Sequence, residues 1–268
     1  MDGLQSSIKI SVVRDGGIPP PEVPGRHSPS PLHEKTHGVV DLANVFTFWE
    51  GQMPGYIKLC MDTWKVPYTV LNYGNLHNYT DLDVEPVKRF TLPQIADVVR
   101  VHVLRDQGGY WLDADTIMLT DKLPETDMVG YPEQRANTIG LLYSEPHSQM
   151  FTEWAKFQDE IINGWETSPY WALMGNAFTD AYVKEHEEVR IHPVEDYWPE
   201  TYMMEGNSPR WQKYRQFYFE ERYTLDDIRP TDLLMLHNSW TPEWYKNMPE
   251  DKVLDANCTL SNILREAL

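Results

Sequence analysis

Two aspartates, Asp113 and Asp115, stand two positions apart directly after the apolar residues 110–112. Alternate side chains of an extended strand share a face, so both carboxylates can converge on one site. Neighbouring carboxylates repel each other and lose hydration unless a positive group joins them. A divalent cation that prefers hard oxygen ligands, Mg²⁺ or Mn²⁺, meets this need and commonly holds substrate phosphates as well. The pair therefore predicts a metal and phosphate site, with an ordinary acidic turn as the alternative.

The residues before this pair predict a helix that begins at Thr91 and stops at Gly108 and Gly109. Threonine is a good N-cap, and glycine adopts the left-handed conformation that ends helices. Asp97 and Arg100 project from one side of this helix, as an ion pair or as ligand-binding charges. A strand then carries the two aspartates to its carboxyl end, where open α/β sheets bind ligands. The apolar face of the helix consists of Ile95, Val98, Val99 and Val103, with His102 expected among them as a core residue whose ring nitrogens are hydrogen-bonded.

Together these residues form the pattern A-D-x-x-R-x-x-x-L-x-x-x-G-G-Y-x-x-D-x-D over residues 96–115. The pattern resembles that of the DXD-motif sugar transferases related to the initiating yeast mannosyltransferase and the large clostridial glucosylating toxins. It is most similar to their capsular polysaccharide synthesis branch, and the likeness runs from about residue 45 to about residue 240. The resemblance implies a GT-A fold, a nucleotide-sugar donor and a divalent metal.

The resemblance also implies roles for residues at the catalytic centre. Asp113, Asp115 and His237 are expected to hold the metal, with Asp113 alternatively reaching the ribose or binding the metal through water. A cation there would neutralise the charge that develops on the β-phosphate of the leaving group. Asp97 and Arg100 are expected to hold hydroxyls of the donor sugar. The alternative for His237, just after a predicted strand, is an ordinary hydrogen-bonded histidine.

Four more positions are expected to form the donor-binding site by the same resemblance. Trp49 opens a W-x-G motif over residues 49–51 and is expected to stack on the donor base, unless it is a buried sheet residue. Asn137 is expected near the donor sugar, with a turn-forming role as the alternative. Gly109 and Trp240 complete the predicted donor site.

The alternation of strand and helix patterns predicts an α/β protein with a Rossmann-like mixed sheet flanked by helices, the GT-A class. Residues 38–268 are expected to form this single domain, preceded by a flexible Pro-rich segment at 1–37. Residues 197–223, rich in Trp and Tyr but weakly periodic, are expected to form a lid or an acceptor-facing insertion. Strands are predicted at 45–49, 68–71, 110–112, 116–119, 128–131, 138–143, 190–194 and 232–236. Helices are predicted at 54–64, 84–90, 150–162, 168–184 and from 261 onward.

Composition excludes some classes of partner. The 268 residues include 23 Lys and Arg against 41 Asp and Glu, a net charge of −18. Without a basic stripe, neither nucleic acid nor an anionic membrane is an expected partner, although one metal-bound diphosphate remains compatible. The sequence contains no run of about 18 apolar residues, so it predicts no transmembrane segment. Because the sequence has only two cysteines and no leader pattern, we expect the protein in the cytosol of a bacterium or of a virus-infected host. If its acceptor is bound to a membrane, we expect the protein at the surface of that membrane.

These observations predict a metal-dependent glycosyltransferase that moves a hexose from a nucleotide sugar to a glycan hydroxyl. Family frequency favours a UDP-sugar, and the resembled families favour retention of configuration in surface or capsular polysaccharide synthesis. Two alternatives use the same features differently. A metal-dependent phosphohydrolase or nucleotidyltransferase would cleave nucleotides without sugar transfer. A non-catalytic carbohydrate-binding domain would bind glycans through its aromatic side chains, independently of metal.

Overall fold

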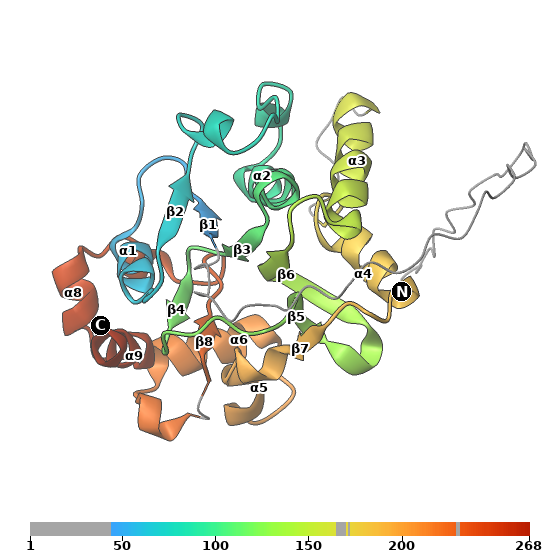
Figure 1. Ribbon diagram of the computed structural model, residues 1–268. Coiled ribbons are helices and arrows are strands. Elements are labelled where there is room, and N and C mark those ends of the chain that lie inside the picture. Colours follow the sequence, from blue (N-terminus) through green and yellow to red (C-terminus); the bar gives the residue numbers. More distant parts are fainter. Residues whose placement is uncertain (1–43, 165–169, 171, 229–230) are drawn as a thin grey trace, which may run out of the picture. The chain divides into compact units, whose positions relative to one another are not determined.

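The computed structural model describes residues 44–164, 170, 172–228 and 231–268 (Figure 1). They belong to one compact unit, Val40–Leu268, whereas the predicted flexible segment 1–37 and its boundary lie outside the described residues. The strands are β1 (Val45–Phe48), β2 (Tyr68–Leu71), β3 (Gly109–Leu112), β4 (Thr116–Met118), β5 (Met128–Tyr131), β6 (Ala136–Ser144), β7 (Ile191–Pro193) and β8 (Leu233–Met235). The expected mixed α/β fold is confirmed.

A mixed sheet with the strand order β2-β1-β3-β6-β5-β7 forms the centre of the fold. β1 pairs in parallel with β2 and β3, whereas β6 runs antiparallel to β3 and β5. The sheet therefore changes strand direction between β3 and β6. Asp113 follows β3 at this point, and its backbone N–H donates to the Gly140 carbonyl at 2.8 Å.

Helices cover both faces of this sheet (Figure 1). They are α1 (Gly55–Asp62), α2 (Leu92–Gln107), α3 (Gln149–Gly164), α4 (Asn176–Glu185), α5 (Glu200–Met203), α6 (Arg210–Arg215), α7 (Glu243–Lys246), α8 (Glu250–Asp255) and α9 (Thr259–Ala267). Strand side chains alternate between the two faces. Trp111 packs in the core cluster of α2, α3 and α4, whereas Leu112 packs in the cluster of α1, α8 and α9.

The glycine pair where α2 ends and β3 begins is required by backbone geometry. Gly108 has φ +63°, and a Cβ there would lie 2.5 Å from Cδ of Pro146. Gly109 has φ +87°, and a Cβ there would lie 2.3 Å from the Asn44 carbonyl oxygen. At the other end of α2, Thr91 and Gln94 form a capping box. The predicted helix, its start and its stop are thus confirmed.

Several predicted elements differ in the structure. The strand predicted at 116–119 is β4, which leaves the main sheet and pairs antiparallel with β8. The segment 84–90 contains only a 3-10 turn at Val87–Arg89. The helix predicted at 168–184 begins only at Asn176, because residues 172–175 form turns, and its predicted start at 168–169 lies outside the described residues. In the described part of the chain, no helix is both long enough and apolar enough to span a bilayer.

The prediction of a lid over residues 197–223 is wrong for much of that segment. Tyr197, Trp198, Tyr214, Phe217 and Tyr218 are buried in the main core cluster. Aromatic side chains at this density bury enough surface to form core structure even without a clean helical period. These five residues are therefore part of the core.

Candidate active site

An arginine bridges two carboxylates where α2 meets the end of β3. The Nη2 of Arg100 lies 3.0 Å from Oδ1 of Asp97 and 3.2 Å from Oδ1 of Asp113. Its Nη1 donates to the carbonyl of Ile139 on β6. The side chain of Arg100 is only 5% exposed. A planar guanidinium that serves three acceptors at once is fixed in orientation, so it fixes Asp113 in turn.

The two oxygens of Asp113 have different surroundings. Oδ1 accepts hydrogen bonds from Trp111 Nε1 at 2.9 Å and faces Arg100. Oδ2 has no hydrogen-bond partner among the described residues and lies 3.0 Å from the position that a Cβ on Gly140 would take. The Asp113 side chain is 38% exposed. One oxygen is thus held by the protein, and the other is available to a ligand.

Asp115 is held from the opposite side by the end of β8. Its Oδ2 accepts the backbone N–H of Asn238 at 2.7 Å, and its carbonyl accepts the N–H of Leu236 at 3.1 Å. Burial, and then the negative charge of Asp113, raise the pKa of Asp115 to about 7. Burial also raises the pKa of Asp97 to about 7, although Arg100 opposes the shift. Three acidic groups therefore share a site with one nearby arginine.

Asp113 and Asp115 fit a divalent cation, but the predicted third ligand does not join them. Two carboxylates that repel each other are suitable oxygen ligands for Mg²⁺ or Mn²⁺, which take their remaining ligands from water and phosphate. Across the described residues, no group of three or more His, Cys, Asp or Glu side chains is placed to hold a metal. The structure thus supplies two protein ligands at most from this motif.

The expected metal-ligand role of His237 is not supported by its contacts. Its Nε2 lies 2.8 Å from Nη2 of Arg210, which also contacts Oε1 of Glu200 at 3.1 Å. Burial and the charge of Arg210 lower the pKa of His237 to about 3. The nitrogen that would bind a metal therefore already contacts Arg210 in this structure, and the metal-ligand role of His237 stays a prediction.

Most of the chain matches a known protein family. A profile of capsular polysaccharide synthesis proteins matches residues 28–247. The chain belongs to this family. Membership of this family confirms the prediction that the protein is a glycosyltransferase of polysaccharide synthesis. Among solved structures, the PaToxG glycosyltransferase is similar at 13% identity and a TM-score of 0.38, over 54% of this chain and 69% of that chain. No curated protein matches the chain significantly.

Trp49 directly follows β1, and its predicted stacking on the donor base stays a prediction. It is half-buried against the core, and its backbone N–H donates to the Leu71 carbonyl at 2.9 Å. Its indole Nε1 is buried without a hydrogen-bond partner among the described residues. The loop that follows lines a hollow of about 500 Å³ with α7 and α8, bounded by Gln52, Met53, Gly55, Asn247, Met248 and Glu250.

The other predicted donor-site residues have mainly local contacts. Asn137 is buried, and its amide is used by helix α4: Nδ2 donates to Asp180 at 3.1 Å, and Oδ1 accepts from Thr179 at 2.8 Å. The ring of Trp240 lies 4.0 Å from the ring of His237. Gly109 serves the close packing at the start of β3 described above. The structure therefore brings together Asp97, Arg100, Asp113 and Asp115, and it leaves the amide of Asn137 engaged elsewhere.

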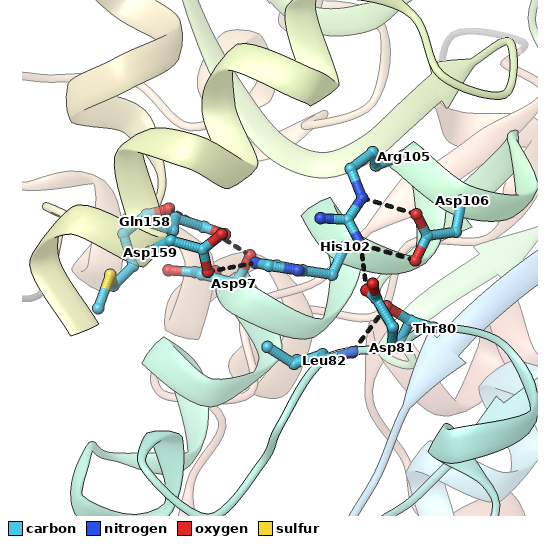
Figure 2. A network of polar contacts seen from close by, with 10 residues as sticks. Thr80, Asp81, Leu82, Asp97, His102, Arg105, Asp106, Gln158 and Asp159 are labelled. Carbon is cyan, nitrogen blue, oxygen red and sulfur yellow. Dashed lines mark hydrogen bonds and ion pairs between the residues drawn. The ribbon is translucent and has the colours of Figure 1, made fainter. Parts of the chain in front are cut away.

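Polar contacts between α2 and α3 hold the helix that carries Asp97 (Figure 2). Gln158 on α3 donates from Nε2 to the Asp97 carbonyl at 3.0 Å. His102 is buried as predicted, but its ring nitrogens have no hydrogen-bond partner in the described structure, and Asp159 lies 3.6 Å away. Burial lowers the pKa of His102 to about 4, so the ring is neutral.

Sequence reasoning missed three residues that support this site: Gln158, Glu200 and Arg210. Gln158 had a usable signal, since it is a polar residue on an otherwise apolar stripe of α3. Glu200 and Arg210 had none, because the segment that contains them lacks a clear period.

Proposed function

We propose that this capsular polysaccharide synthesis protein transfers a hexose from a UDP-sugar to a hydroxyl of a glycan acceptor, with Mn²⁺ or Mg²⁺ bound at Asp113 and Asp115. The proposal rests on one observation: these two carboxylates lie close enough to repel each other. Burial, and then the negative charge of Asp113, raise the pKa of Asp115 to about 7. A cation between them would relieve this repulsion, and its open positions suit a diphosphate.

The residues of the chain prepare the site for that cation. Arg100 and Trp111 hold Oδ1 of Asp113, whereas Oδ2 has no hydrogen-bond partner in the part of the chain that the structure describes. The Asn238 N–H holds Oδ2 of Asp115. A bound cation would supply Lewis-acid stabilisation of the departing diphosphate, an effect typically worth several kcal/mol. Fixed ligands make that stabilisation available without reorganisation during the reaction.

Asp97 and Arg100 would bind hydroxyl groups of the donor sugar in this proposal. Both side chains are nearly buried. Oδ2 of Asp97 lies 3.2 Å from the position that a Cβ added to Gly175 would take. A small residue there leaves room beside the carboxylate. The proposal follows the resembled families in assigning retention of configuration, and no side chain is assigned as a general base.

Assays of sugar release and transfer from UDP-hexoses test the proposal. Activity is expected with Mn²⁺, to disappear with EDTA, and to be lost in Asp115→Ala. Asp251→Ala is a matched control, because this acidic side chain is 71% exposed at the start of α8. Activity that survives both EDTA and Asp115→Ala would remove the metal site from the proposal. UDP-hexose cleavage without transfer to any glycan would instead favour a hydrolase.

A further inference from the structure

The contact with Arg210 determines which ring nitrogen of His237 carries the proton. A guanidinium has five N–H donors and no acceptor. Because Arg210 Nη2 lies 2.8 Å from Nε2 of His237, that nitrogen must accept the hydrogen bond through its lone pair. The ring proton is therefore on Nδ1, for which the described residues provide no hydrogen-bond partner. The ring is neutral in this arrangement, because a protonated histidine has no lone pair to offer.

Arg210 is itself held by three other groups. Its Nε and Nη2 donate to Oε1 of Glu200 at 3.2 and 3.1 Å. Its guanidinium carbon lies 3.1 Å from the ring centre of Trp198 and 5.4 Å from that of Trp240. Glu200 is fully buried, so departure of the arginine would leave a buried carboxylate unpaired. Movement of Arg210 away from His237 would therefore be energetically unfavourable.

The position of His237 makes this contact relevant to the reaction. Asn238, the next residue, donates its N–H to Asp115, and the backbone N–H of His237 donates to Tyr214 at 3.2 Å. The histidine therefore stands beside the proposed metal site on an ordered loop. Its Nε2 would be a natural metal ligand if it were free.

We propose that Arg210 is a positioning residue that fixes His237 as a neutral Nδ1–H donor and excludes Nε2 from the metal. The part of this inference that concerns the metal rests on the proposed function. Excluding the histidine leaves Asp113 and Asp115 as an all-oxygen protein set, which favours Mg²⁺ and Mn²⁺ over metals that prefer nitrogen. It also leaves more coordination positions to diphosphate oxygens, and it leaves Nδ1–H free to donate to an oxygen of the substrate.

The tautomer is tested on the metal-free protein. Nitrogen-15 NMR of the histidine side chains is expected to show His237 with a protonated Nδ1 and an unprotonated Nε2 at neutral pH. A proton on Nε2 of His237 would overturn the inference. This result is independent of whether the protein binds a metal or transfers a sugar.

The exclusion is tested with bound Mn²⁺. Pulsed electron paramagnetic resonance is expected to show no nitrogen coupling to Mn²⁺ in the wild-type protein. In the double variant Glu200→Gln, Arg210→Met, which removes the arginine without leaving a buried charge, we expect nitrogen coupling to appear and Ni²⁺ affinity to rise about tenfold or more. Arg215→Met is the matched control, since this arginine of α6 donates to the Trp240 carbonyl and not to His237.

The outcomes separate this inference from the proposed function. Nitrogen coupling in wild-type Mn²⁺ protein would overturn the exclusion while leaving metal dependence intact. Failure of the wild-type protein to bind Mn²⁺ would count against the proposed function, and the tautomer measurement would still decide the role of Arg210. Both wild-type measurements stand alone if the double variant fails to fold.

Discussion

The backbone N–H of Asn238 donates to Oδ2 of Asp115 at 2.7 Å, across 123 positions of sequence. This bond joins the loop after β8 to the turn between β3 and β4. The same two regions are joined by the pairing of β4 with β8, which begins at Thr116 and Met235. Asp115 is therefore held in place by a second sheet rather than by its own turn, close to a carboxylate that repels it.

The first prediction concerns Asp115→Asn, which should stabilise the metal-free protein at about pH 8 while abolishing transfer. The pKa of Asp115 is about 7 in the folded state against an ordinary value of 3.8. Between these values the folded state binds a proton that the unfolded state has released, so stability falls as pH rises through this window and stays reduced above it. We expect a gain of about 1–3 kcal/mol in the free energy of unfolding by denaturant titration.

The same titration supplies a control. At about pH 4 the two proteins should have nearly equal stability, because the carboxyl is then protonated in the folded state. Asp97, whose pKa is also about 7, should preserve part of the pH dependence in the variant. An unchanged pH dependence in Asp115→Asn would show that this carboxyl is not under strain.

A second prediction concerns the pH dependence of metal binding. Protons and Mn²⁺ compete for Asp115, whose pKa is about 7. The apparent Mn²⁺ affinity should therefore weaken by up to about tenfold per pH unit below this value and level off above it. Calorimetric titration in buffers of different ionisation enthalpy should also detect proton release at about neutral pH. A flat affinity between pH values of about 5 and 8 would contradict ligation by Asp115.

A third prediction uses two glycines. In Gly140→Ala, the new methyl group would lie 2.6 Å from Met235 Cε and 3.0 Å from Asp113 Oδ2. Overpacking here should destabilise the protein by about 1–3 kcal/mol and should weaken Mn²⁺ binding through displacement of Asp113. Gly164→Ala is the control, since the new methyl group would have no atom of a described residue within 4 Å beyond its chain neighbours and its own helix backbone. The control should be neutral or slightly stabilising and should leave metal binding unchanged.

A fourth prediction concerns Arg100→Lys. Lysine keeps the charge but cannot serve Asp97, Asp113 and the Ile139 carbonyl in one plane, so we expect a loss of about 1–3 kcal/mol in stability and a large loss of transfer. Arg105→Lys is the matched control on the same helix, where the arginine pairs with Asp81 and Asp106. It should retain activity, and equal losses of activity in both variants would argue against a specific role for Arg100.

The α2–β3 segment could be predicted from sequence because its signals are local. The cap at Thr91, the apolar face, the glycine pair and the two aspartates lie within one continuous stretch. Their order alone predicted a helix followed by a strand that carries carboxylates. The pairing of Asp97 and Arg100 was also a local expectation, because three positions separate them on a helix.

The state of His237 could not be predicted in this way. Its decisive contact is with Arg210, 27 positions earlier, in a segment whose pattern did not indicate helix α6. The side chain of Asn137 was likewise beyond local reasoning, because its partners Thr179 and Asp180 lie on α4, more than forty positions away. Residue type identified both as candidates, but tertiary packing determined what they bind.

Titration of Mn²⁺ followed by electron paramagnetic resonance, with and without UDP, tests whether Asp113 and Asp115 hold a metal. We expect the wild-type protein to bind Mn²⁺ more tightly when UDP is present, and the double variant Asp113→Asn, Asp115→Asn to lose this binding while remaining folded. Equal Mn²⁺ binding by the wild-type protein and the double variant, in the presence of UDP, would contradict a metal site at these two aspartates.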